Sequence, residues 1–175
     1  MLLRVLALTC VVAVPQLSLA QQRRTANQHV PDSCPITKPG EQPIVPPPPY
    51  PAKAPKGTFW YGTSQLWTLL GDTGTWAGLG HYTPNDPTFR QKLFYWRQGY
   101  DWNAEPRPRL TVTGRRLDAA APPLMADGAN GGYREEDWKS FMVVGINLPT
   151  LGCWEIKGRY ENTDLTFVVW VAEQR

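Results

Sequence analysis

The chain has 175 residues, a formal net charge of +3 and 42% hydrophobic residues, a composition that fits one globular domain. The nearly balanced charge argues against nucleic acid or a strongly charged membrane as a partner. Beyond the first twenty residues, no stretch is long and apolar enough to predict a membrane-spanning helix.

The first twenty residues have the pattern of a signal peptide. Arg4 supplies a positive charge, and the apolar run at 5–15 is too short to cross a bilayer. Residues 18–20 form a small-x-small cleavage motif. Cleavage after Ala20 predicts a secreted, periplasmic or cell-envelope chain of 155 residues that begins at Gln21.

Two of the three cysteines would remain in the exported chain. Export places them in an oxidising environment, so we expect a disulfide between Cys34 and Cys153. The alternative interpretation of the leader is a lipoprotein with a modified Cys10. That cleavage would divide the apolar run in two.

Residues 21–56 form a polar and then proline-rich arm, which includes the run 46–51. Because proline fixes φ and lacks a backbone donor, this arm is expected to be extended polyproline II. It could be a linker or cell-wall spacer, or a recognition segment for an aromatic groove. A structural role is favoured.

Residues 57–175 are predicted to form one all-β domain, an antiparallel β-sandwich. Short aromatic and β-branched runs alternate here with Gly, Pro, Asn and Asp, and no helical periodicity is sustained. The expected strands are 58–62, 65–70, 75–79, 91–97, 109–113, 140–148, 152–160 and 164–172.

The last two expected strands predict which side chains enter the core. Their alternation places one set on the core face: Trp154, Ile156, Tyr160, Leu165, Phe167, Val169 and Val171. A four-residue turn at 161–164 predicts that Tyr160 lies opposite Leu165. The same register would place Trp170 on the outer face, opposite Glu155.

An uncovered Trp170 on a flat strand would favour aggregation. A bridge between Cys34 and Cys153 would bring the arm to this face. We therefore expect the arm to cover Trp170 through Ile44, Val45 or the prolines. The rival is an inter-sheet disulfide of the antibody type, which would need an inward Cys153, against the alternation.

Residues suited to catalysis or metal binding are few. His29 and His81 have no second ligand at a useful spacing, and no serine lies in a nucleophile elbow. The adjacent carboxylates Glu135, Glu136 and Asp137 resemble a solvated turn more than a glycosidase pair or a calcium loop. We predict no catalytic residue, no metal site and no cofactor.

Two adjacent arginines follow Gly114, just after the expected strand at 109–113. Since neighbouring side chains on a strand point to opposite faces, either Arg115 or Arg116 should turn inward. A pair with a carboxylate such as Asp118 would then fix the following corner. An anion-binding fork is the alternative.

Most of the eight tryptophans lie at alternating strand positions, as core residues would. Trp102 differs, because it lies in a polar loop bounded by prolines. Aromatic rings flanked by hydrogen-bonding groups suit a sugar or peptide site. We predict that Tyr100, Trp102, Asn103 and Arg107 bind an extracytoplasmic ligand: a glycan, a cell-wall polymer or a peptide.

Several motifs carry a resemblance: Ser33-Cys34-Pro35, Gly114-Arg115-Arg116-Leu117-Asp118 with Ala121-Pro122-Pro123-Leu124, Gly152-Cys153-Trp154-Glu155, and Leu165-Thr166-Phe167-Val168. With these the chain resembles an uncharacterised family of secreted bacterial proteins. The resemblance implies an immunoglobulin-like fold and carries no activity. The chain departs from it in the aromatic insertion at 100–108.

Together these features predict a secreted, non-enzymatic binding or accessory module. One alternative is a secreted hydrolase that acts on carbohydrate, with carboxylates such as Glu105 and Glu135 converging in space. Another is a structural envelope protein that uses the proline-rich arm as a spacer.

Overall fold

The computed structural model describes residues 30–136 and 138–174. The expected signal peptide with Cys10, the proposed cleavage site at Ala20, His29 and Asp137 therefore lie outside the described residues. Within the described part of the chain, no helix is long and apolar enough to cross a membrane.

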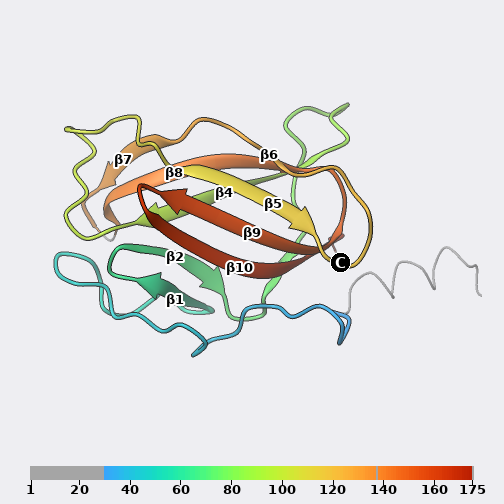
Figure 1. The fold of residues 1–175 in the computed structure, drawn as a ribbon, viewed down its shortest axis with the longest axis horizontal. Helices are drawn as coiled ribbons and strands as arrows, with labels where there is room; N and C mark the ends of the chain where they lie inside the picture. Colours follow the sequence, from blue (N-terminus) through green and yellow to red (C-terminus); the bar gives the residue numbers. More distant parts are fainter. Residues whose placement is uncertain (1–29, 137, 175) are drawn as a thin grey trace, which may run out of the picture.

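Two β-sheets face each other, so the all-β sandwich is confirmed (Figure 1). The first sheet contains β1 (Thr58–Thr63), β2 (Leu66–Gly71), β4 (Phe89–Trp96), β8 (Lys139–Leu148) and β6 (Met125–Ala126) in that order, with β7 (Asn130–Arg134) also paired to β8. The second has the order β3 (Thr75–Ala77), β10 (Thr163–Ala172), β9 (Gly152–Tyr160) and β5 (Thr111–Arg116). Only β3 pairs in parallel among the described strands. The immunoglobulin-like topology stays a prediction.

Each expected strand overlaps an observed one, whereas β6 and β7 were not predicted. The sequence of β7, Asn-Gly-Gly-Tyr-Arg, has little β-propensity. It pairs because its glycines allow close approach: a Cβ on Gly132 would lie 2.6 Å from the ring of Phe141. Packing therefore overrides local propensity at this edge.

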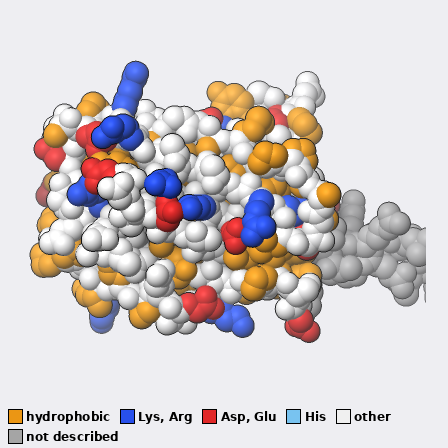
Figure 2. Space-filling model, in the orientation of Figure 1, with side chains coloured by type: hydrophobic (Ala, Val, Ile, Leu, Met, Phe, Trp, Pro, Cys, Tyr) orange, Lys and Arg blue, Asp and Glu red, His pale blue; other side chains and the backbone are white. Residues whose placement is uncertain are grey.

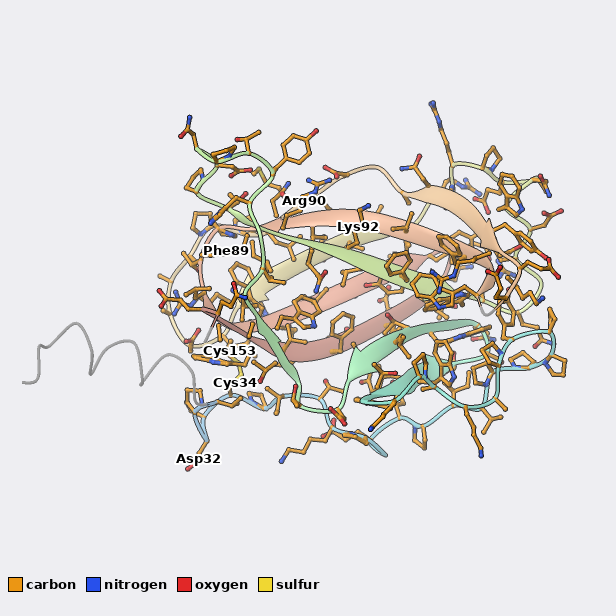
Figure 3. All side chains as sticks on the ribbon, turned by 180° about the vertical axis from the view of Figure 1, so that it is seen from behind. Asp32, Cys34, Phe89, Arg90, Lys92 and Cys153 are labelled. Atoms are coloured by element: carbon orange, nitrogen blue, oxygen red, sulfur yellow. A yellow bond between two sulfur atoms is a disulfide. The ribbon has the colours of Figure 1, made fainter. Side chains whose placement is uncertain are left out.

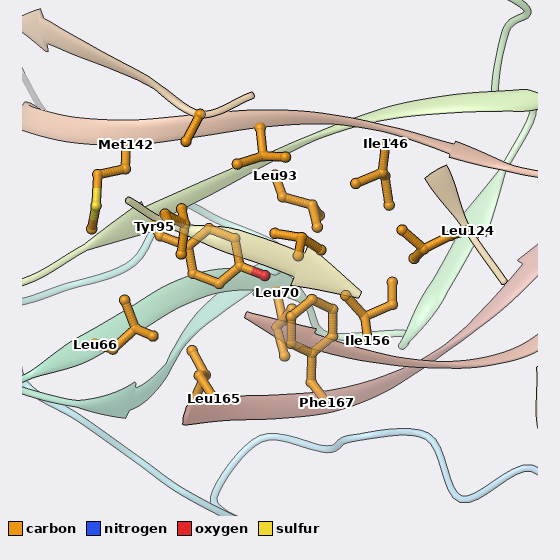
Figure 4. Packing of buried hydrophobic residues seen from close by; sticks show 14 of the residues in the cluster. Leu66, Leu70, Leu93, Tyr95, Leu124, Met142, Ile146, Ile156, Leu165 and Phe167 are labelled. Carbon is orange, nitrogen blue, oxygen red and sulfur yellow. The ribbon is translucent and has the colours of Figure 1, made fainter. Parts of the chain in front are cut away.

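The main core fills the space between the two sheets (Figure 4). Alternate residues of each long strand point inward, and they include Leu93, Tyr95, Met142, Val144, Ile146, Trp154, Ile156, Leu165, Phe167, Val169 and Val171. Burial of each large apolar side chain is worth roughly 1.5–3 kcal/mol. The prediction for the core face of β9 and β10 is confirmed.

The predicted register between β9 and β10 is wrong by two residues. Tyr160 pairs with Thr163, so the turn consists of Glu161 and Asn162 alone. Glu161 has a φ of 51°, in the left-handed region that glutamate seldom adopts, and the pattern of residue types did not indicate so tight a turn. Since a shift of two residues keeps the same faces, the core assignment survives the error.

The predicted disulfide is confirmed: Cys34 and Cys153 are bridged, with their Cα atoms 5.7 Å apart (Figure 3). Trp170 lies opposite Cys153 instead of Glu155, as the corrected register requires. It is buried in a small cluster against which Val30 and Ile36 pack. The outer face is therefore covered by the arm, as expected.

Two of the arm residues predicted for this cover, Ile44 and Val45, do not provide it. Thr37 follows Ile36 and exchanges hydrogen bonds with Val168, since its N–H donates to the Val168 carbonyl and its Oγ1 accepts from the Val168 N–H, each at 2.9 Å. The disulfide holds residues near 34 beside β10. By Ile44 the chain has reached the first sheet, and Val45 is 73% exposed.

The rest of the arm covers the outer face of the first sheet. Tyr50 is buried with Trp60, Trp67 and Trp96, and its ring meets Trp67 edge-on at 5.2 Å. The proline run is not extended throughout, because the Tyr50 N–H donates to the Pro47 carbonyl and closes a turn. The bend turns the aromatic ring onto the sheet.

Candidate functional site

The loop between β4 and β5, which contains the predicted ligand residues, folds back onto β7. Tyr100 is only 7% exposed, and its hydroxyl donates to the Glu105 carbonyl at 2.8 Å. Trp102 is half-buried against the main core. The Gly131 N–H donates to the Pro106 carbonyl at 2.8 Å, which fastens the loop to the sheet.

The four predicted residues therefore differ in what they offer to a ligand. The ring of Tyr100 belongs to the core, and burial is the main reason that its pKa is raised. Asn103 and Arg107 are exposed, and Trp102 keeps part of its surface at the protein boundary. Their role in binding stays a prediction.

Glu105 anchors the end of this loop to β9. Its carboxylate accepts hydrogen bonds from the Tyr160 hydroxyl and, at 3.2 Å, from the Arg109 N–H. Burial and then the Glu105 hydrogen bond raise the pKa of Tyr160 to about 12. The phenol thus remains a hydrogen-bond donor at neutral pH.

Glu135, the other carboxylate of the hydrolase hypothesis, belongs to a separate network. It accepts a hydrogen bond from the Tyr133 hydroxyl and pairs with Lys139 at 3.3 Å. Within residues 30–136 and 138–174, no hydrogen bond joins Glu135 to Glu105. Glu105 bonds β9 through Tyr160, whereas Glu135 bonds only neighbours within four residues, Tyr133 and Lys139.

A groove of about 620 Å³ lies where this loop enters β5. It is lined by Arg109, Thr111, Arg159, Glu161 and Asn162. The start of β5, the end of β9 and the tight β9–β10 turn form it, and Thr111 lies directly opposite Arg159. The groove therefore depends on pairing between residues far apart in the sequence.

Two acidic groups at the groove are paired with cations, and a third, Glu105, accepts hydrogen bonds from the Arg109 N–H and the Tyr160 hydroxyl. Glu161 binds Arg97 at 2.8 Å, and Asp164 binds Lys157 at 2.6 Å. The hydrogen bond from Lys157 is the main cause of the lowered pKa of Asp164.

The two arginines of the groove have weaker engagements. Arg159 reaches Asp164 only at 3.7 Å, and no ion pair among the described residues engages the Arg109 side chain. Both guanidinium groups therefore keep donors available to a ligand.

A second hollow of about 220 Å³ lies next along the same two strands. It is lined by Thr113, Gly114, Arg115, Glu155 and Lys157. Arg115 and Glu155 face each other across the strands at 2.7 Å. Figure 2 shows positive and negative side chains interspersed over this face of the molecule.

One arginine of the Arg115–Arg116 pair is structural, as predicted. The Arg116 guanidinium donates twice to Asp118, at 2.7 and 3.1 Å, and once to Thr150 at 3.3 Å. Asp118 also accepts from the Cys153 N–H at 3.1 Å. This pair fixes the corner after β5, beside the disulfide.

The described part of the chain contains no group of three or more His, Cys, Asp and Glu residues placed to hold a metal ion. His81 is exposed, with Nδ1 2.7 Å from the Thr88 carbonyl and its ring beside Phe89 at 5.2 Å. These contacts give His81 a local role in the loop before β4.

The groove residues could not be identified from the sequence alone. Alternation along β9 indicated that Lys157 and Arg159 point outward, but it could not bring Arg109 or Asn162 beside them. That proximity depends on the β5–β9 register and on the turn, and both are tertiary features. The exposed Arg107 of the predicted site is two residues from Arg109. The predicted ligand residues are therefore close in sequence to the groove but do not line it.

Comparison with known proteins provides no assignment: no family model and no curated protein matches the sequence, and no solved structure matches the fold.

Proposed function

We propose that this chain is an exported, non-enzymatic binding module whose ligand surface combines the exposed part of the Trp102 loop with the neighbouring arginine groove. The observation that carries the proposal is their continuity, because Arg109 both ends the loop and lines the groove. The Cys34–Cys153 disulfide supports export, since such bonds persist in oxidising compartments.

The chemistry of this surface suits recognition of a polar ligand. Asn103 and Asn162 supply amides, Arg107 and Arg109 supply guanidinium donors, and Trp102 adds part of an aromatic ring. Binding sites combine an apolar surface with a few polar groups of this kind, and the polar groups fix the orientation of the ligand. A glycan, a cell-wall polymer or a peptide would use these groups.

A ligand screen on the exported chain tests the proposal. The protein would be titrated with soluble glycans, cell-wall fragments and peptides while tryptophan fluorescence is followed. A ligand of this surface should lose most of its affinity in Trp102→Ala, because stacked aromatic rings often dominate such sites. Trp76→Ala is the matched control, since it removes another half-buried tryptophan that packs against the core.

If Trp102→Ala fails to fold, the exposed variants Asn103→Ala and Arg107→Ala provide the same test. Binding that is unchanged in both would place the ligand elsewhere and refute the proposed surface. A folded chain that binds no member of the screen would contradict the binding function itself.

A further inference from the structure

We infer that the groove and the adjacent hollow bind an extended anionic polysaccharide that lies along β5 and β9 and is held through its carboxylate or sulfate groups. This inference rests on the proposed function and names its ligand class. The two hollows and their rim carry four cations, Arg109, Arg115, Lys157 and Arg159, against three carboxylates, Glu105, Glu155 and Asp164, a surplus of one positive charge. Glu161 is neutralised by Arg97.

The cations that remain available are in the groove. The nearer partner of Asp164 is Lys157, which leaves the Arg159 guanidinium with a long contact only. Arg109 is exposed at the rim. A guanidinium fork matches the geometry of a carboxylate or sulfate and can bind it with two parallel hydrogen bonds.

The spacing of the two hollows favours an extended ligand. Thr111 lines the first and Thr113 the second, and two residues along a strand span about 7 Å. Both hollows are open and shallow, and each places a hydroxyl beside a cation. A chain of sugar units could contact both at once, with its hydroxyl groups on the threonines and its acid groups on the arginines.

An acidic peptide is the competing ligand, and the structure favours it less. Peptides commonly add to a sheet edge, but the edge strand β5 is occupied at Gly114, whose carbonyl accepts the Leu124 N–H at 3.3 Å. The lining residues of the two hollows offer hydroxyl, amide and charged groups and no apolar pocket for a peptide side chain. The half-exposed Trp102 nearby offers an aromatic surface to a sugar ring.

Affinity electrophoresis of the whole exported chain tests the inference with three polymers: polygalacturonate, neutral dextran and polyglutamate. Polygalacturonate should retard the protein most. Arg109→Ala/Arg159→Ala should weaken this binding about tenfold or more, because two charge-assisted contacts are lost. Lys53→Ala/Lys92→Ala is the matched control, since it removes the same charge from exposed positions outside the groove and should bind as the unmodified chain does.

The remaining outcomes separate the hypotheses. Equal weakening in the two double variants would show attraction to net charge and overturn the inference. Equal retardation by polyglutamate would also overturn it, in favour of an acidic peptide. Retardation by dextran alone would leave a binding module with a neutral ligand, so the ligand class would be wrong while the proposed function stood. Failure of all three polymers in this assay would refute the inference, and the broader screen would then decide the binding function.

Discussion

Tyr95 shows how a single residue can carry a polar group at a cost to stability. Its side chain is fully buried in the main core, and its hydroxyl has no hydrogen-bond partner among the described residues. Burial accordingly raises the pKa of this phenol. The ring lies against β9 at Gly158, where an added Cβ would be 2.6 Å from it. The space beside Gly158 therefore fits an aromatic ring, whereas the Tyr95 hydroxyl makes no hydrogen bond that would stabilise the fold.

Tyr95→Phe is expected to leave the free energy of unfolding unchanged or to raise it by up to about 1 kcal/mol, because an unsatisfied buried hydroxyl is removed. Tyr61→Phe is the matched control. The Tyr61 hydroxyl donates to the Thr166 carbonyl at 2.9 Å, and its loss should cost about 0.5–1.5 kcal/mol. Urea unfolding measures both. A cost for Tyr95→Phe equal to that for Tyr61→Phe would contradict this account.

Asp118 should contribute to the acid sensitivity of the fold. The hydrogen bond from Arg116 is the main cause of its lowered pKa, below the ordinary value of 3.8. A carboxyl with a lowered folded-state pKa stabilises the protein above its unfolded pKa, and the contribution disappears as the pH falls through the folded value. Asp118→Asn should therefore be less stable than the unmodified chain at neutral pH.

Thermal unfolding at a series of pH values tests the role of Asp118. The difference between the two proteins should shrink as the pH falls below about 4, as the carboxyl takes up its proton. Asp164→Asn is a more exposed control and should cost less, since surface ion pairs contribute little. A difference for Asp118→Asn that stays constant down to pH 2 would refute the assignment.

At the scale of strands and turns, local patterns predicted the elements but not their pairing. Alternation in β9 and β10 identified both strands and their buried faces, because side-chain direction follows directly from strand geometry. The register was missed because the strained conformation of Glu161 allows a two-residue turn. Its ion pair with Arg97 is a tertiary contact, which the residues of the turn do not reveal.

The same division applies to the candidate site. The Arg116–Asp118 pair could be predicted because the two residues are close in the sequence and both lie at a strand end. The groove could not be predicted from the sequence, because Thr111 and Arg159 lie side by side only through the pairing of β5 with β9. The burial of Tyr100 was missed for a similar reason, since it depends on the contact between its loop and Gly131 of β7.

The disulfide links the arm to β9 across a sequence separation of 119 residues. In the chain-entropy model a loop of this length is worth roughly 4–5 kcal/mol. Cys34→Ser and Cys153→Ser should therefore lower stability to a similar extent, as measured by chemical unfolding. The double variant should cost little more than either single change, because one bridge is lost in each case. If the loss of stability in the double variant equalled the sum of the two single losses, the two cysteines would act independently and the account would be wrong.

For the molecule as a whole, the outer strands are covered by neighbouring segments. In the described chain Thr37 bonds the exposed edge of β10, and the Gln42 carbonyl accepts the Gly62 N–H of β1 at 3.1 Å. At the other side, Leu124 and Pro106 bond β5 and β7. Open edges promote pairing with other chains, so these contacts oppose aggregation.

The arm therefore connects the two sheets as part of the fold. It runs beside β10 and then beside β1 (Figure 1). The spacer hypothesis assigns no packing role to the proline-rich segment, whereas in the structure Tyr50 is 9% exposed and its hydroxyl donates to the Ser140 carbonyl at 3.2 Å. Trp60 adds a hydrogen bond from Nε1 to the Pro51 carbonyl at 3.1 Å. Such contacts make the stability of the sandwich depend on the arm.

Tyr50→Ala tests this dependence directly. The substitution removes the edge contact with Trp67 and opens the tryptophan cluster on the outer face of the first sheet, so it should cost about 3–5 kcal/mol, as other buried aromatic truncations do. Val45→Ala changes an exposed side chain of the same arm and should stay within about 0.5 kcal/mol of the unmodified chain. Urea unfolding followed by tryptophan fluorescence reports on both. Equal stability of the two variants would mean that the arm is only a tether, because a packed segment must distinguish a buried ring from an exposed methyl group.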